Sequence, residues 1–262
     1  MDILIATLVV GVIGLVLGVA LVAAGRKFHV DTDPREAEIR DLLPGNNCGA
    51  CGYAGCDAVA EAIARGEAPA NACPVCSSEK VEQIAVVMGV EAQAAERRIA
   101  FVRCGGDCKK TAVTSEYVGV TDCRAAALAG LNPWACAHGC LGFGSCAAAC
   151  NYDAISVADG VAVVEASRCT GCGLCAAACP KNLIELIPAG SKAAVRCSSP
   201  DKGVEVRKLC SAGCIGCGIC TKQCPEGAVT LSGNLAHVDY TKCVGCGLCA
   251  EKCPTHAVGW TT

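Results

Sequence analysis

The hydrophobic and polar positions along the chain separate one long apolar run from many short mixed segments. Residues 3–24 are all apolar or small. As a helix this run would extend about 33 Å at 1.5 Å per residue, which matches the ~30 Å hydrocarbon core of a bilayer. Asp2 stands where a secretory signal would carry a basic residue, so the run does not have the pattern of a signal peptide.

The flank of this run predicts its orientation. Arg26 and Lys27 follow it directly, and basic residues stay on the cytoplasmic side of a membrane helix. The sequence therefore predicts a single-pass protein of the cytoplasmic membrane. Residues 1–28 would be a transmembrane anchor, and the large C-terminal part would lie on the cytoplasmic side.

Short helices are expected after the apolar run. Asp33-Pro34 has the pattern of an N-cap followed by proline at the first helical position, which predicts a helix that ends near Leu43. A second helix is expected between Cys56 and Arg65, and a third from Ser78 to about Met88.

Two β-hairpins are expected later in the chain. Residues 155–158 and 161–164 flank Asp159-Gly160, a turn pair typical of a type I′ hairpin. Residues 229–231 and 235–238 flank a second turn. Short strands, short helices and cysteine-rich loops together predict an α+β fold.

The two hairpins belong to an internal repeat. Adding 74 to the numbers of eight cysteines gives eight further cysteines, and the first copy holds Cys136, Cys140, Cys146, Cys150, Cys169, Cys172, Cys175 and Cys179. One position breaks the match, because Cys217 of the second copy corresponds to Phe143 of the first. We therefore expect two equivalent cysteine-rich modules at 136–190 and 210–262, joined by a connector at 191–209. A four-Cys module at 29–90 and a connector at 91–135 would precede them.

Composition indicates what holds such modules together. The chain has 26 cysteines in 262 residues, whereas aromatic residues make up only 3%. Large aromatic side chains normally contribute much of the buried area of a core. Metal ligation is a natural substitute, because its binding energy becomes folding energy. The net charge of −3 argues against a nucleic-acid binder, which would usually be basic.

The cysteine spacing identifies the metal group. Three runs read C-x2-C-x2-C-x3-C-P, and they begin at Cys169, Cys214 and Cys243. In bacterial ferredoxins this spacing gives three ligands to one [4Fe–4S] cluster and the fourth to the neighbouring cluster. Structural zinc uses two C-x2-C pairs per site, and disulfides are rare in a reducing compartment. Neither alternative fits the spacing.

Exchange of the fourth ligand predicts four clusters in the repeats. The expected sets are Cys214, Cys217, Cys220 with Cys253; Cys243, Cys246, Cys249 with Cys224; Cys169, Cys172, Cys175 with Cys150; and Cys140, Cys146, Cys179 with Cys136, which would replace the cysteine missing at Phe143.

Two further groups of cysteines lie outside the repeats. A compact set near the N-terminus, which predicts a fifth cluster, contains Cys48, Cys51, Cys56 and Cys73. Cys104, Cys108 and Cys123 would give three ligands of a sixth. Its fourth is either Cys197, which shares Val-Arg-Cys with Cys104, or Cys210; otherwise these are buried thiols or a lone metal site. Six sets of four use 24 of the 26 cysteines and leave Cys76 and one of these two unassigned.

Other cofactor motifs are absent from the sequence. No G-x-G-x-x-G follows a predicted strand, and no Walker loop occurs. We expect neither a nicotinamide nor a flavin site on this chain, and no catalytic residue of its own.

The segment 47–56, N-C-G-A-C-G-Y-A-G-C, followed by Cys73-Pro74, resembles the B subunit of the Rnf complex. The apolar run before it and the long cysteine-rich tail are similar to the extended form of that protein in anaerobic bacteria, and the resemblance covers essentially the whole chain. Cys76 lies where family members often have glycine, and Asn151 follows Cys150 in place of proline. Neither difference removes a ligand.

The resemblance implies a role. The Rnf complex is a membrane-bound oxidoreductase that passes electrons between ferredoxin and NAD⁺ and moves Na⁺ or H⁺. Its B subunit would take electrons from soluble ferredoxin and relay them through [4Fe–4S] clusters, with the other Rnf subunits as partners. The alternative is a membrane-tethered polyferredoxin, a passive electron carrier for another dehydrogenase.

Overall fold

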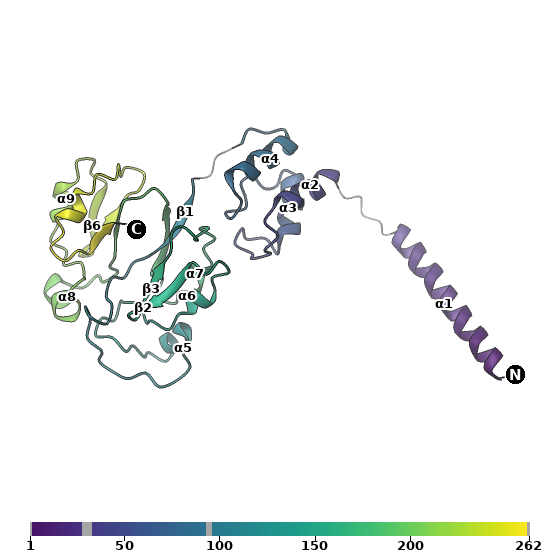
Figure 1. Cartoon of the computed structure of the whole chain (residues 1–262), viewed down its shortest axis with the longest axis horizontal. Helices are drawn as coiled ribbons and strands as arrows, with labels where there is room; N and C mark the ends of the chain where they lie inside the picture. The colour runs from purple at the N-terminus through teal and green to yellow at the C-terminus, as the bar shows by residue number, and fades with distance from the viewer. Residues whose placement is uncertain (1, 28–32, 93–95, 261–262) are drawn as a thin grey trace.

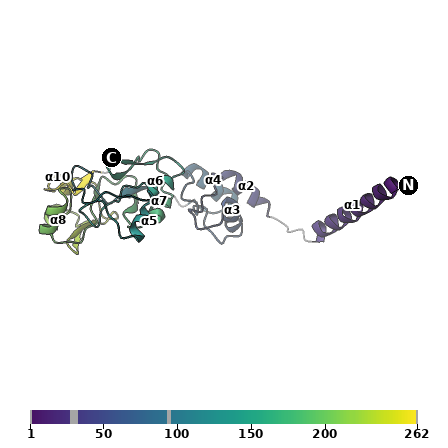
Figure 2. The ribbon, with the colours of Figure 1, turned by 90° about the horizontal axis from the view of Figure 1, so that it is seen from below.

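The computed structural model describes residues 2–27, 33–92 and 96–260. Helix α1 (Asp2–Lys27) lies apart from the other elements in both views (Figures 1 and 2). Helices α2, α3 and α4 come next along the molecule, and the strands lie beyond them. The chain is therefore arranged as a helix, a small helical module and a larger cysteine-rich part.

The expectation of an N-terminal transmembrane helix is not supported. Within the described residues, no helix has the length and apolar character needed to cross a membrane.

The helical module is formed by α2 (Pro34–Leu42), α3 (Cys56–Ala64) and α4 (Ser78–Met88). Asp33 caps α2 as predicted, because its carboxylate accepts a hydrogen bond from the Arg35 N–H at 2.9 Å. The three helices bury one apolar stripe each, and Ile39, Ile63 and Ile84 are fully buried where the stripes meet. This small core holds the cysteine loop that precedes α3.

The first ferredoxin module contains α6 (Ser145–Ala148), β2 (Ile155–Ala158), β3 (Val161–Val164), α7 (Leu174–Ala178) and β4 (Ile184–Pro188). The second contains α9 (Ile219–Gln223), β6 (Val229–Ser232), β7 (Leu235–Val238), α10 (Leu248–Glu251) and β8 (Val258–Trp260). Both predicted hairpins are confirmed, as antiparallel pairs β2–β3 and β6–β7. The internal repeat is therefore a repeat of structure as well as of cysteine spacing.

Each module also takes a strand from the connector that precedes it. Strand β1 (Arg98–Val102) pairs with β4, with Val102 opposite Ile184. Strand β5 (Ala193–Val195) pairs with β8, with Val195 opposite Val258. Since 184 plus 74 is 258, β1 and β5 occupy equivalent places in the two copies. The Val-Arg-Cys echo in the sequence marks these two strands.

The connectors hold the remaining helices and contacts between the copies. Helix α5 (Cys123–Leu128) lies before the first module, and α8 (Gly203–Leu209) lies before the second. Tyr240 of the second copy donates a hydrogen bond to the Glu185 carboxylate of the first at 3.0 Å. Ser198 donates to the Arg103 carbonyl at 2.9 Å. The two copies therefore pack against each other through half-buried polar contacts.

Gly171 and its repeat equivalent Gly245 allow a test of how β1 packs on the first module. Both have positive φ, +71° and +70°, and an L-residue in such a conformation costs about 1–3 kcal/mol. A Cβ at 171 would also collide with the Arg98 carbonyl of β1, whereas a Cβ at 245 would meet only the flexible Lys192 side chain, at 3.1 Å. We expect Gly171→Ala to be the more destabilising change.

The measurement is an anaerobic thermal scan at fixed rate, followed by the visible absorption of the metal-loaded protein. The midpoint for Gly171→Ala should lie at least ~4 °C below that for Gly245→Ala, as expected for about 1 kcal/mol in a domain of this size. Equal midpoints would contradict the assigned contact between residue 171 and β1.

Candidate metal centres

The described cysteine side chains are all free thiols, and most lie in groups. In the helical module, Cys73 interacts electrostatically with Cys51 and Cys56. Cys48 lies in the same loop, half-buried, and interacts with Tyr152 of the first ferredoxin module. These four thiols, which we call the N-terminal set, are the four that the cysteine spacing grouped.

Three groups in the repeats also follow the predicted sets. The Cys220 set is Cys214, Cys217, Cys220 and Cys253, which line one cavity. The Cys249 set contains Cys224, Cys243, Cys246 and Cys249, and Cys249 interacts with the other three. In the Cys175 set, Cys169 and Cys172 interact with Cys175, and Cys150 packs on the same core. Cys224 and Cys253 thus lie in the exchanged positions that the ferredoxin spacing predicts.

The group around Cys146 differs from the predicted one. Cys123, Cys140, Cys146 and Cys179 line a common cavity, and both Cys140 and Cys146 interact with Cys123 and Cys179. We call these four the Cys146 set. Cys136 was expected as the fourth member, but it does not line this cavity.

A hydrogen-bond chain holds Cys123 at this place. The Cys123 N–H donates to Ser145 Oγ at 2.7 Å, and Ser145 Oγ donates to the Asp122 carboxylate at 2.7 Å. Asp122 is the N-cap of α5 and also accepts from the Ala125 N–H. Phe143, at the position of the missing cysteine, packs against Tyr117 with ring centroids 4.5 Å apart. The connector that contains α5 therefore supplies a fourth thiol in place of the cysteine that is missing at position 143.

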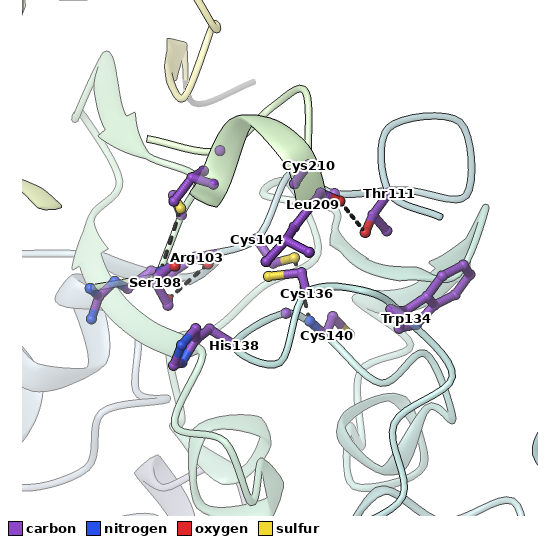
Figure 3. Close-up of a pocket in the computed structure, with 16 residues that line it drawn as sticks. Arg103, Cys104, Thr111, Trp134, Cys136, His138, Cys140, Ser198, Leu209 and Cys210 are labelled. Atoms are coloured by element: carbon purple, nitrogen blue, oxygen red, sulfur yellow. Dashed lines mark hydrogen bonds between the residues drawn. The ribbon is translucent and has the colours of Figure 1, made fainter. Parts of the chain in front are cut away.

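The structure does not bring Cys104, Cys108 and Cys123 together as one group. Cys123 belongs to the Cys146 set, and Cys108 is exposed, with its N–H bonded to the Asp159 carbonyl at 2.9 Å. Cys104 instead lines a second cavity together with Cys136, Cys197 and Cys210 (Figure 3). We call these four the interface set.

Two signals in the sequence point to the interface set. The 74-residue offset pairs Cys136 with Cys210, and the Val-Arg-Cys echo pairs Cys104 with Cys197. Combining the two pairs would have given the interface set. Cys76, Cys108 and Cys123 would then have remained as candidates for the incomplete set around Phe143.

Burial makes these thiols weak acids. Burial, reinforced by neighbouring thiols, raises the pKa of Cys146 to about 11, that of Cys175 to about 12 and that of Cys220 to about 11. Only the thiolate ligates metal. A bound cation would have to displace the proton, which couples metal binding to proton release.

Backbone N–H groups face several of the sulfur atoms. Ala100 donates to Cys169 at 3.3 Å, and Ala228 donates to Cys224 at 3.2 Å. Hydrogen bonds of this kind stabilise thiolates and tune the potential of iron–sulfur centres. Among the described residues, no three Cys, His, Asp or Glu side chains converge closely enough to hold a single metal ion. In a cubane, by contrast, each thiolate binds a different iron, so a four-thiol set fits that group.

Three family models match these same regions. Residues 43–75 match a model described as "Putative Fe-S cluster", residues 162–185 match a 4Fe-4S binding domain, and residues 213–257 match a 4Fe-4S dicluster domain.

Similar curated proteins are described as B subunits of ion-translocating oxidoreductase complexes. The B subunit of the Na⁺-translocating ferredoxin:NAD⁺ oxidoreductase complex of Acetobacterium woodii is 42% identical over 89% of this chain and 71% of its own. The B subunit of the proton-translocating ferredoxin:NAD⁺ oxidoreductase complex of Clostridium ljungdahlii is 46% identical over 88% of this chain and 82% of its own. The B subunit of the ion-translocating oxidoreductase complex of Methanosarcina acetivorans is 41% identical, over 88% of each chain.

This chain belongs to the family of Rnf B subunits. The resemblance expected from the segment 47–56 is thereby confirmed. The cysteines outside all three matched regions include Cys104, Cys123, Cys136, Cys197 and Cys210. The family models therefore say nothing about these five cysteines of this Rnf protein.

The assignment of Cys123 to the Cys146 set can be tested by removing this thiol and placing a new one at residue 143. We expect Cys123→Ala to lower the iron content by about four atoms per chain, the content of one cubane. Adding Phe143→Cys to that variant restores the C-x2-C-x2-C spacing and should restore the iron. The measurement is iron per chain after anaerobic reconstitution.

Cys108→Ala is the matched control, because this exposed thiol belongs to no set. It should keep the wild-type iron content. Full iron in Cys123→Ala, or loss of iron in Cys108→Ala, would contradict the assignment of Cys123 to the Cys146 set.

Proposed function

We propose that this chain is the electron-transfer subunit of a membrane-associated ferredoxin:NAD⁺ oxidoreductase complex, and that it takes electrons from reduced ferredoxin. Family membership supports the complex and its other subunits as partners. The observation that carries the electron-transfer role is the row of adjacent thiol sets. [4Fe–4S] clusters, when bound to these thiols, supply one-electron carriers.

Contacts link the first three sets in sequence. Asn46 Nδ2 donates to Tyr152 Oη at 2.7 Å, and Tyr152 interacts with both Cys48 and Cys172. The Tyr152 side chain thus joins the N-terminal set to the Cys175 set. Cys175 in turn interacts with Cys146. The protein positions each set next to the following one, which is what stepwise electron transfer needs.

The free thiols support a reducing compartment for the cluster-bearing part. No cysteine in the described part of the chain forms a disulfide. Structural disulfides persist in oxidising compartments, whereas cytosolic thiols stay reduced. We therefore place the cysteine-rich part on the cytoplasmic side of the membrane, where soluble ferredoxin and NAD⁺ meet it.

The reaction fixes what the chain must deliver. Conversion of NAD⁺ to NADH takes two electrons and one proton, whereas each thiol set serves a one-electron carrier. The chain would therefore pass two electrons singly from ferredoxin to the subunits that hold the nicotinamide site. The Na⁺ or H⁺ translocation named for the relatives would belong to the same complex.

The test is ferredoxin-dependent NAD⁺ reduction by the complex that co-purifies with this chain under anaerobic conditions in mild detergent. We expect activity in the intact complex and its loss when this chain is removed, with activity regained on adding the chain back. A chain that purifies alone, loaded with iron but attached to no complex that reduces NAD⁺, would instead indicate a passive polyferredoxin.

A further inference from the structure

The interface set lies between the two copies of the repeat and is enclosed by both. Cys104 and Cys136 come from the first copy and its connector, whereas Cys197 and Cys210 come from the second and its connector. Cys197 and Cys210 are buried, and the other two are half-buried. In Figure 3 the sulfur atoms of Cys104 and Cys136 lie beside each other in the middle of the cavity.

The four thiols interact as a connected group. Cys104 interacts electrostatically with Cys136, and Cys210 interacts with both Cys136 and Cys197. A Cβ built on Gly106 would lie 3.1 Å from Cys210 Sγ and 3.9 Å from Cys104 Sγ. The absence of a side chain at residue 106 therefore leaves the space next to these two sulfurs open.

The four thiols form two repeat-related pairs. Cys136 and Cys210 are separated by the 74-residue offset of the repeat. Cys104 and Cys197 each follow two residues after the equivalent strands β1 and β5. The residue before each makes the same bond: Arg103 N–H donates to the Leu183 carbonyl and Arg196 N–H to the Ala257 carbonyl, both at 2.7 Å. Each copy therefore contributes two equivalent cysteines to one shared site, one that follows β1 or β5 and one from the loop at position 136 or 210.

The surroundings of the sulfurs suit a cubane. Cys140 N–H donates to Cys104 Sγ at 3.4 Å, and Ser199 N–H donates to Cys197 Sγ at 3.5 Å. These are the backbone donors that iron–sulfur ligands use. Across the copies, Thr111 Oγ1 donates to the Leu209 carbonyl at 2.9 Å, next to Cys210, which fixes the position of that thiol.

We propose that Cys104, Cys136, Cys197 and Cys210 hold a [4Fe–4S] cluster shared by the two ferredoxin modules, and that this site is the electron link between them. The site rests on the geometry just described, whereas the role as a link rests on the proposed function. The interface set is adjacent to the Cys146 set through the Cys140–Cys104 hydrogen bond. It is adjacent to the Cys220 set because Cys197 interacts with Cys214.

This link completes a continuous series of sets. Single electrons from reduced ferredoxin can then pass along the N-terminal, Cys175, Cys146, interface, Cys220 and Cys249 sets, in either direction, before two of them reduce NAD⁺ elsewhere in the complex. Without the interface set, the described contacts between thiol sets join the two modules nowhere else.

The experiment compares iron content and electron paramagnetic resonance of the full chain after anaerobic reconstitution. Cys136→Ala with Cys210→Ala should lose about four irons per chain, one cubane, and keep the rest. In the reduced state, the magnetic coupling between the cluster at the Cys146 set and the cluster at the Cys220 set should be weaker than in the wild type. Cys76→Ala with Cys108→Ala, which removes two thiols outside every set, should change neither readout.

A volume-preserving pair, Cys136→Ser with Cys210→Ser, separates loss of ligands from loss of packing. It should also lose about four irons. Unchanged iron in both pairs, or loss of all iron in both, would overturn an independent site at the interface.

The assembled complex then distinguishes this inference from the proposed function. In a complex that carries either double variant of Cys136 and Cys210, ferredoxin-dependent NAD⁺ reduction should fall at least tenfold. A four-iron loss with wild-type activity would keep the site but overturn its role as the link. If the wild-type complex itself lacks this activity, the proposed function fails while the iron measurements still decide the site.

Discussion

The constraint on which the structure depends is the burial of thiols that are close enough to repel one another as thiolates. The fully buried large side chains are aliphatic, such as Ile63, Ile84 and Ile187, and the cores are correspondingly small. Buried sulfur occupies much of the interior, and desolvation keeps Cys104, Cys146 and Cys220 protonated near neutral pH, each with a pKa of about 11. Iron can replace those protons and hold together segments that are far apart in the sequence. Folding and cofactor binding in this chain are therefore one thermodynamic process.

The spacing of the cysteines predicted the local parts of the fold well. Three ligands within seven residues are fixed by the loop itself, so the Cys220 and Cys249 sets came together where the motif placed them. The hairpins were predictable for the same reason, since Asp159-Gly160 determines a turn without help from distant residues. Because of the 74-residue repeat, each local assignment in one copy also predicted the equivalent assignment in the other.

Ligands that arrive from distant loops could not be predicted in this way. Cys123 follows no motif, and only the Ser145–Asp122 hydrogen bonds of the folded chain bring it to Cys146. Cys136 belongs to the interface because its partners lie in the other copy, and the packing of two modules has no signature in one spacing. The apolar run at the N-terminus, by contrast, is a local pattern that led to a wrong prediction. Its length in the sequence suggested a membrane span, and the described part of the chain contains no helix that meets that requirement.

The exchange of Cys224 and Cys253 between neighbouring sets has a consequence for biosynthesis. The Cys220 set is incomplete until residue 253 has been made, and the Cys249 set needs Cys224 from the earlier part of the chain. During translation, the Cys220 set would therefore present only three thiols until Cys253 emerges. The N-terminal set, by contrast, is complete by residue 73 and can be filled first. Metal loading of this protein thus has a built-in order, from the amino end to the carboxyl end, and a chain that stopped before Cys243 would complete neither centre of the second module.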